Sequence, residues 1–277
     1  MTEFFQSLAQ HAHMQHALLA GLLASIAAGV VGTYVVVRRI VFISGGIAHA
    51  VLAGMGIAYW MEGDPFVGAL IAAIVSALII GLISLRAGQH EDTLIGALWA
   101  VGMAVGILFI SRAPGYKVDL NSYLFGDILL VTRQDLLLIG VLDLAIVLAV
   151  IYFYREFQAV CFDEEYARLQ GVPADLVYLL LLCLIALTVV TMIRLVGLIL
   201  VIALLTLPAA IAQQYLRSLG RMMILGAILA FGFTFAGLAA SYQPDLPAGS
   251  TIVLVAATAY LVSVAGRMIA RRWRERS

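Results

Sequence analysis

A long apolar stretch between residues 175 and 212 reads DLVYLLLLCLIALTVVTMIRLVGLILVIALLTLPAAIA. Its only charged side chains are those of Asp175 and Arg194. A helix needs about 20 consecutive apolar residues to cross the hydrocarbon core of a bilayer. The stretch therefore predicts two membrane spans, 175–192 and 195–212, that are separated by a short break around Arg194. The second span is also compatible with a broken or re-entrant helix.

The composition of the whole chain agrees with a membrane protein. Of its 277 residues, 64% are hydrophobic and 12% are charged, and the mean hydropathy is +1.07. In a soluble domain about half of the residues are apolar and about a quarter are charged. The polar residues of this chain are therefore too few to cover a water-exposed surface. This excludes a soluble enzyme, a nucleic-acid-binding domain and a disordered chain.

Nine segments are long and apolar enough to cross a membrane, and eight or ten spans are also compatible with the pattern. They lie near 17–37, 43–61, 66–85, 94–110, 136–154, 175–192, 195–212, 222–241 and 251–268. The second segment is also compatible with a broken or re-entrant helix. Because the connections are short, we expect an all-α, polytopic bundle that forms one transmembrane domain over residues 1–277, without a soluble domain. No G-x-x-x-x-G-K-[ST] loop occurs, so any ATP that the protein consumes must be bound by another chain.

Basic residues predict the orientation, because Lys and Arg concentrate in cytoplasmic loops. No Lys or Arg precedes the first span, so it lacks the charged region of a secretory signal peptide, and we expect this span to be retained. With nine crossings and the N-terminus outside, twelve basic residues fall on the cytoplasmic side and four outside, which accounts for all 16. The sequence thus predicts an outer N-terminus and a cytoplasmic C-terminus.

One predicted cytoplasmic connection, residues 155–174, contains a short helix with clear boundary signals. An acid can cap its start, acids fill its first turn, a base lies in its last turn, and Gly and Pro end it. These residues are Asp163, Glu164, Glu165, Arg168, Gly171 and Pro173. A short helix bounded in this way on the cytoplasmic face indicates a docking feature rather than a linker.

Two ionisable side chains lie inside predicted spans, where a charge is costly and needs a reason. His49 follows Gly45 and Gly46, which weaken helix regularity and allow neighbouring helices to approach closely. It either lines a cation path or hydrogen-bonds a neighbouring helix. Asp143 is either a proton or cation relay or a carboxylate that faces a wet cavity or a polar partner. Pro208 predicts a kink, either around a transport path or for purely structural reasons.

The N-terminal segment 1–16 is expected to form a helix at the outer face. Its His13 and His16 are three residues apart, so on a helix they share a face and can bind a divalent metal, or they belong to a solvated interfacial helix. No Ser-His-Asp or H-E-x-x-H arrangement can be placed in the chain, so support for an intramembrane enzyme is thin.

Several stretches together resemble the membrane permeases of zinc, manganese and iron ABC importers. They are RRIVFISGGIAHAVLAG (38–54), the acid pair Glu91-Asp92, DLNSYLFGDIL (119–129), FDEEYARLQG (162–171), VGLILVIALLTLPAAIA (196–212) and DLPAGSTIVL (245–254). Each motif is weak alone, but they occur in the family's order and cover nearly the whole chain. The resemblance implies a location in the cytoplasmic membrane of a bacterium or archaeon.

The resemblance also implies partners and roles. The chain would be one half of a lipid-embedded homodimer, served by a separate cytoplasmic ATPase and an extracytoplasmic metal-binding protein, with no nucleic acid. It would be a transport subunit rather than an enzyme, carrying a divalent metal ion and binding no cofactor of its own. The helix in FDEEYARLQG would be the coupling helix that docks on the ATPase. Its coupling residues would be Asp163, Glu164, Glu165, Arg168 and Gly171, while Gly45, Gly46 and Pro208 would shape or gate the path.

The second-helix motif departs from the family at one position. Family members commonly carry an Asp four residues before the histidine, where this chain has Gly45 before His49. Without that carboxylate the imidazole favours zinc, with His49 and Asp143 as candidate metal ligands. Manganese or iron in the same architecture is the alternative. A gradient-driven transporter with these two residues as proton relays is another, but it would not require the cytoplasmic helix 163–171.

Overall fold

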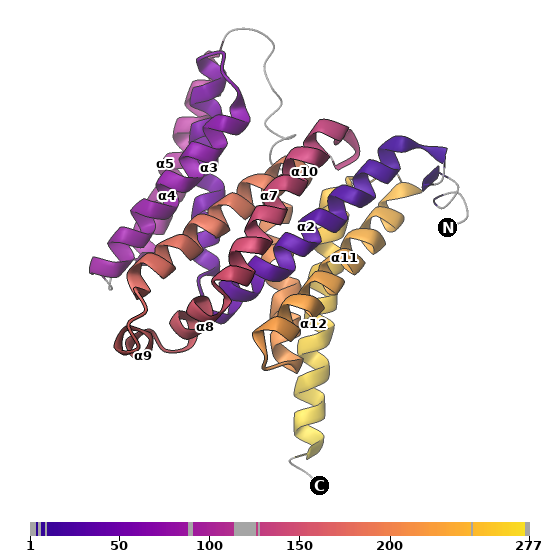
Figure 1. Ribbon diagram of the computed structural model, residues 1–277. Coiled ribbons are helices and arrows are strands. Elements are labelled where there is room, and N and C mark those ends of the chain that lie inside the picture. The colour runs from indigo at the N-terminus through magenta and orange to yellow at the C-terminus, as the bar shows by residue number, and fades with distance from the viewer. Residues whose placement is uncertain are drawn as a thin grey trace.

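The computed structural model describes residues 4, 7–8, 10–87, 91–113, 126, 128–244 and 246–274. Nearly all of them are helical, and no strand occurs among them (Figure 1). Eight of the helices are long and apolar enough to cross a membrane. The all-α transmembrane bundle predicted from the sequence is therefore confirmed.

The eight long helices follow the predicted spans closely. They are α2 (Ala12–Val37), α3 (Val41–Trp60), α4 (Pro65–Ala87), α5 (Glu91–Arg112), α7 (Arg133–Tyr152), α10 (Ala174–Tyr215), α11 (Leu219–Tyr242) and α12 (Ala248–Arg274). Three short helices complete the described chain: η1 (Ile128–Leu130), α8 (Tyr154–Phe162) and α9 (Glu164–Leu169). Because α3 is continuous, the broken or re-entrant alternative for segment 43–61 is wrong.

Helix α10 joins two predicted spans into one 42-residue element that breaks at Gly197. This glycine has φ 77° and ψ 166°, a conformation that is essentially confined to glycine. Gly126 approaches so closely that a Cβ on it would lie 2.3 Å from the backbone nitrogen of Gly197. The break therefore lies at this glycine contact, whereas the helix continues through Pro208 to Tyr215.

The contacts of α10 show that its two arms fold back on each other. Near the break, Arg194 pairs with Asp135 at the start of α7, with 2.5 Å between the nitrogen and the oxygen. At the beginning of α10, Asp175 pairs with Arg168 of α9. Just beyond its end, Gly220 donates its N–H to the hydroxyl of Tyr154, the first residue of α8. Both ends of α10 thus lie at the level of α8 and α9, and the described chain crosses the bundle nine times.

The bundle has two opposite ends. The Asp135 face is the end where α4 and α7 begin, and the Glu164 face is the end that carries α8 and α9. The beginning of α2 and the end of α12 lie at opposite ends of the bundle (Figure 1). An odd number of crossings places the chain ends in this way.

Helix α2 occupies the centre of one half of the bundle, between α10 and α11. Glycines permit this packing, since a Cβ on Gly29 would lie 2.4 Å from the nitrogen of Ala227, and one on Gly32 would lie 2.1 Å from the oxygen of Leu205. Helices in a membrane associate through such close contacts of small residues, because lipid supplies no hydrophobic drive. Helices α3, α4 and α5 form the other half, and α10 contacts both halves.

Candidate functional site

His49 lies in α3, and its imidazole stacks on the indole of Trp99 from α5. The ring centroids are 3.9 Å apart and the ring planes are inclined by 14°. The residue is 8% exposed, and its Nδ1 atom is buried without a hydrogen-bond partner in the described part of the chain. Buried polar atoms are rarely left without a partner. Since neutral imidazole is the commonest protein ligand for metals, this nitrogen is a candidate ligand for a passing cation.

The glycines that precede His49 let α3 pack closely on α5. A Cβ on Gly46 would lie 2.5 Å from Cγ2 of Ile95, so a side chain there would push the two helices apart. At Gly45 a Cβ would lie 3.5 Å from Cζ3 of Trp99, which is an ordinary contact distance. Gly46 therefore serves helix packing, whereas position 45 has space for a β-carbon beside the imidazole–indole pair.

Asp143 is buried in α7, at 4% exposure. Both of its carboxylate oxygens are buried without a hydrogen-bond partner among the described residues. It shares the buried face of α7 with Ile139 and Ile146. That helix packs mainly on α2 and α10, whereas the helix of His49 packs mainly on α4, α5 and α10. The two candidate ligands therefore lie on helices that pack mainly on different neighbours and have α10 in common.

Within the described residues, no group of three or more His, Cys, Asp or Glu side chains is close enough to hold a metal ion. This includes His13 and His16, which lie in the first turns of α2. The acids Asp119 and Asp127 of the motif DLNSYLFGDIL (119–129) lie outside the described residues. The described chain thus offers one or two candidate ligands at a place, such as His11 and His13 with ring centroids 5.3 Å apart, rather than a group of three or more.

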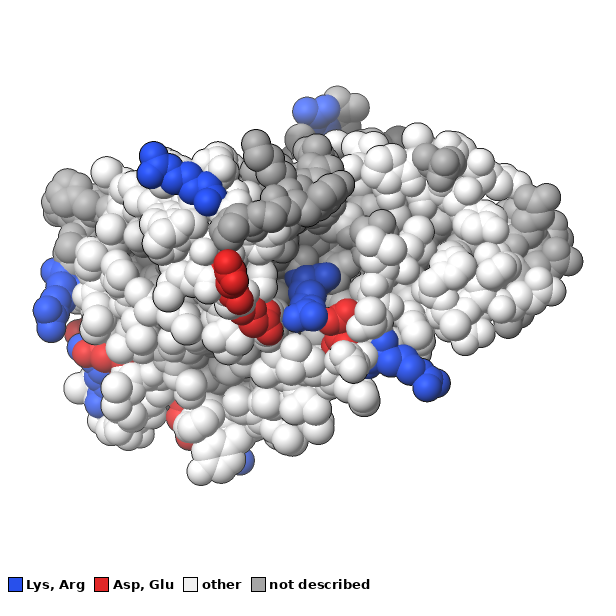
Figure 2. All heavy atoms as spheres, turned by 90° about the horizontal axis from the view of Figure 1, so that it is seen from above, with Lys and Arg blue, Asp and Glu red and all other residues white. Residues whose placement is uncertain are grey.

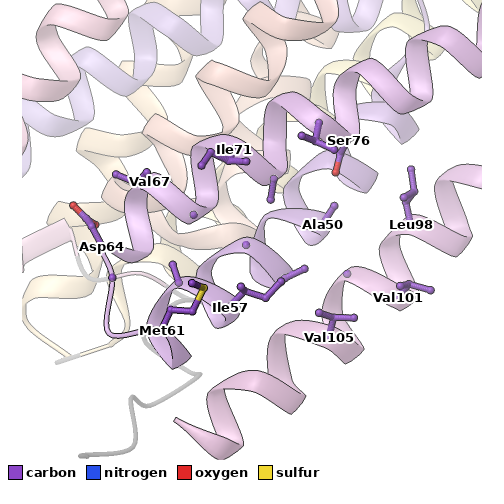
Figure 3. Close-up of a pocket in the computed structure, with 18 residues that line it drawn as sticks. Ala50, Ile57, Met61, Asp64, Val67, Ile71, Ser76, Leu98, Val101 and Val105 are labelled. Atoms are coloured by element: carbon purple, nitrogen blue, oxygen red, sulfur yellow. The ribbon is translucent and has the colours of Figure 1, made fainter. Parts of the chain in front are cut away.

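A groove of about 700 Å³ runs between α3, α4 and α5 (Figure 3). Of its 18 lining residues only Asp64, at one end, and Ser76 carry polar side chains, and His49 is not among them. The residues of α4 and α5 that line the groove, such as Ile71 and Val101, have exposed apolar side chains. This groove therefore has the character of a lipid-facing surface and offers little to a metal cation.

The predicted cytoplasmic helix is present as α9. Asp163 caps it by accepting a hydrogen bond from the backbone N–H of Tyr166 at 2.8 Å. Arg168 in the last turn donates to Glu164 at 2.9 Å and to Asp175 at 2.6 Å. Gly171 follows with φ 80° and donates its N–H to the carbonyl of the same arginine. The boundary signals in the sequence thus act as predicted.

The outward side of α8 and α9 carries exposed apolar side chains. Phe162 is 62% exposed, Tyr166 57% and Leu169 80%. These residues lie between two membrane spans, in a segment that is itself too short to cross a bilayer. Glu165 on the same helix is also exposed, whereas Glu164 is half-buried. Exposed apolar side chains outside the membrane mark a protein contact more often than a free surface.

At the Asp135 face, charged residues pair across helix ends. Asp135 forms a capping box with Thr132 at the start of α7 and also accepts the Arg194 guanidinium. That guanidinium lies 5.0 Å from the ring centroid of Phe66, the second residue of α4. Viewed from above, opposite α9, this face shows acidic and basic side chains side by side near its centre, with mostly uncharged surface around them (Figure 2). The sequence alone identifies Arg194 only as a loop residue.

Two further residues of the site were missed by sequence reasoning. Trp99 looks like one more apolar residue of its span, and only the close approach of α3 and α5 places it over His49. Arg38 looks like an ordinary charge at the end of a span, but its side chain reaches Glu164. Arg38 and Glu164 are 126 positions apart, so no local signal in the sequence indicates their contact.

Residues 10–267 match the ABC 3 transport family. The chain belongs to this family. An uncharacterised membrane protein of Synechocystis sp. is 47% identical over 96% of this chain and 95% of that protein. The manganese transport system membrane protein MntC of Halalkalibacterium halodurans is 35% identical over 99% of this chain and 95% of its own.

A solved structure supports the same family assignment. A chain of PsaBC from Streptococcus pneumoniae, determined in complex with Fab, superposes with a TM-score of 0.86 at 34% identity, covering 95% of this chain and 94% of that chain. The ABC 3 transport family therefore accounts for the fold over nearly the whole chain. The family resemblance inferred from the quoted motifs is confirmed.

Proposed function

We propose that this chain is the membrane permease of an ATP-driven importer of divalent transition metals. Support comes from the ABC 3 transport family and from relatives that are named as metal transport proteins. The observation that carries the proposal is the segment formed by α8 and α9, which presents exposed apolar side chains outside the membrane spans. A permease needs such a surface when its energy comes from another subunit.

The exposed surface of α9 is the proposed coupling surface for a separate ATPase. Tyr166 and Leu169 are three residues apart and share one side of the helix, and Glu165 adds a charge beside them. Movement of the ATPase would displace α9 and switch the permease between two states. Asp163, Arg168 and Gly171 hold the helix in shape for this role.

The Glu164 face is the proposed cytoplasmic side, with the N-terminus outside and the C-terminus inside. The distribution of basic residues supports this orientation. A bacterial or archaeal cytoplasmic membrane is the proposed location, an extracytoplasmic metal-binding protein the proposed partner at the Asp135 face, and a homodimer the proposed assembly. Cysteine labelling of a Leu169→Cys variant in intact cells tests the orientation. Reaction with a membrane-impermeant reagent would show that the Glu164 face lies outside, opposite to the proposal.

His49 is the proposed contact for the metal on its way through the bundle, and zinc is the proposed cargo. A lone imidazole without a neighbouring carboxylate favours zinc over manganese, and position 45 is a glycine. Manganese is the second candidate, because a relative of matching length is named as a manganese transport protein. Asp143 is a proposed second contact, reached through a rearrangement of α7 relative to α3.

ATP hydrolysis by the reconstituted complex tests this proposal. The chain and its proposed partner ATPase are placed in liposomes, and zinc, manganese or iron is supplied on the proposed binding protein. We expect the zinc-loaded protein to stimulate hydrolysis most strongly. Stronger stimulation by manganese would show that manganese rather than zinc is the cargo. Transport by the chain alone along an ion gradient would overturn the whole proposal.

A further inference from the structure

Arg38 connects four helices at the Glu164 face. It is the C-cap residue of α2. Its Nη2 donates to Glu164 of α9 and its Nη1 to the carbonyl oxygen of Val160 in α8, each at 2.5 Å. Its guanidinium carbon lies 5.3 Å from the ring centroid of Tyr178 in α10. One side chain therefore ties the end of α2 to α8 and α9 and also contacts α10.

The backbone at Arg38 forms a short turn between α2 and α3. Only residues 38–40 separate the two helices. Arg39 has φ 62°, a left-handed conformation that few side chains favour. The backbone N–H of Ile40 reaches back to the carbonyl oxygen of Val35 at 3.0 Å. A force on the Arg38 side chain would therefore act directly on the joint where α3 begins.

Helix α3 runs from this turn to the candidate metal contact, His49, without a break. It begins at Val41 and is helical through His49. At a rise of about 1.5 Å per residue, the imidazole lies about 12 Å along the axis from the first residue of the helix. Because close packing makes helices move as rigid elements, a displacement at the turn would be felt at His49 and at its stacking partner Trp99.

The partner carboxylate is held on the inner side of α9 rather than offered to an outside protein. Glu164 is half-buried and accepts hydrogen bonds from both Arg38 and Arg168. Burial would raise the pKa of this carboxyl, but the two guanidinium groups outweigh it and hold the pKa below its ordinary value. The residue therefore stays ionised at neutral pH, where its charge can pair with Arg38.

We propose that Arg38 is the positioning residue through which movement of α9 reaches the α2–α3 turn and, through it, the helix of His49. This inference rests on the proposed function, because it assumes that α9 is displaced by an ATPase. It separates two roles within α9. Exposed Tyr166 and Leu169 would receive the movement, and half-buried Glu164 would pass it to Arg38.

The ratio of metal taken up to ATP hydrolysed in proteoliposomes tests this inference. Arg38→Gln removes the charge of the guanidinium group and shortens the side chain, but it keeps a polar amide. The matched control is Arg39→Asn, which removes one charge at the next position and tolerates a positive φ. We expect Arg38→Gln to lower the ratio about tenfold, as for loss of a charged hydrogen bond, with the ATPase still bound, and the control to keep the wild-type ratio.

A reversible cross-link separates a transmitting role from a purely structural one. In a background with Cys161→Ser and Cys183→Ser, the pair Arg38→Cys and Glu164→Cys is joined with a short reducible bifunctional thiol reagent. We expect the cross-link to restore the ratio and reduction to lower it again. Should Arg38→Gln leave the ratio unchanged while the wild-type complex transports metal, this inference alone is overturned. Absence of ATP-dependent uptake by the wild-type complex would instead overturn the proposed function.

Discussion

The imidazole of His49 lies flat against the indole of Trp99, with 3.9 Å between the ring centroids and one imidazole nitrogen left without a partner among the described residues. The stack fixes the plane of the imidazole between α3 and α5. Such aromatic pairs contribute about 0.5–1.5 kcal/mol beyond the area they bury. The plane of the ring that carries the candidate ligand nitrogen is thus held in place.

Replacement of His49 tests its role as a metal contact. We expect His49→Ala to lower metal uptake at least about tenfold, because even supporting residues of metal sites change affinity about 10–100-fold. Thermal unfolding in detergent should change little. The control is Trp99→Phe, which keeps a stacking surface and should keep most uptake. Full uptake by His49→Ala would contradict the role as a metal contact and indicate that this residue serves helix packing.

Restoring the family's carboxylate should shift metal preference. Gly45→Asp places an acid one helical turn before His49, at a position where a β-carbon meets only ordinary contacts. Because a carboxylate suits manganese better than a lone imidazole does, the manganese-to-zinc uptake ratio should rise. Competition uptake with both metals measures it. Gly45→Asn, of matched size without the charge, should leave the ratio unchanged, and an equal rise in both variants would contradict the argument.

The backbone of Gly197 makes a clear stability prediction. Gly197→Ala forces a side chain into a conformation that costs about 1–3 kcal/mol, so the unfolding midpoint should fall. Gly232→Ala is the control, since nothing lies within 4 Å of a Cβ there and its φ is not in the positive range; alanine in a helix gains up to about 1 kcal/mol over glycine. If both variants have the same unfolding midpoint, the conclusion that the break of α10 requires a glycine at position 197 is wrong.

The apolar surface of α9 should be needed for ATPase binding. Leu169→Glu replaces the most exposed apolar side chain of that helix with a charge, while Gln170→Glu adds the same charge at the neighbouring exposed position. We expect the first change to abolish co-purification of the ATPase and the second to have little effect. Normal co-purification with Leu169→Glu would place the docking surface elsewhere.

Acid should weaken the tie between Arg38 and Glu164. The folded-state pKa of this carboxyl lies below its ordinary value of 4.5. Its stabilising effect is therefore present above about pH 4.5 and is lost as the pH falls through the lower folded-state pKa. Unfolding midpoints measured from about pH 6 to about pH 3 should fall less steeply for Glu164→Gln than for the wild type. Parallel curves would show that the pair contributes nothing.

Much of this architecture could be predicted from local properties of the sequence. Hydropathy located the spans, and the capping signals at Asp163 and Gly171 located α9, because both depend on neighbouring residues. The return of α10 at Gly197 was expected near Arg194, but its position depends on the distant Gly126. A kink was also expected at Pro208; the helix continues through this residue to Tyr215, and the kink stays a prediction.

Contacts between distant segments could not be predicted from the sequence. Nothing local indicates that Trp99 covers His49, or that Arg38 meets Glu164 across the bundle. The two candidate ligands, His49 and Asp143, were paired by their chemistry, but their helices α3 and α7 pack mainly on different neighbours. Whether they meet during transport depends on helix movement, and their joint role stays a proposal.

Uptake of radioactive zinc into proteoliposomes that contain this chain, its ATPase and the binding protein examines the energy source itself. The proposal predicts that zinc accumulates only when ATP is present on the side of the membrane that carries the ATPase. This accumulation should disappear when the ATPase is omitted or when Leu169→Glu prevents its binding. Equal accumulation without the ATPase, driven by a proton gradient alone, would contradict it.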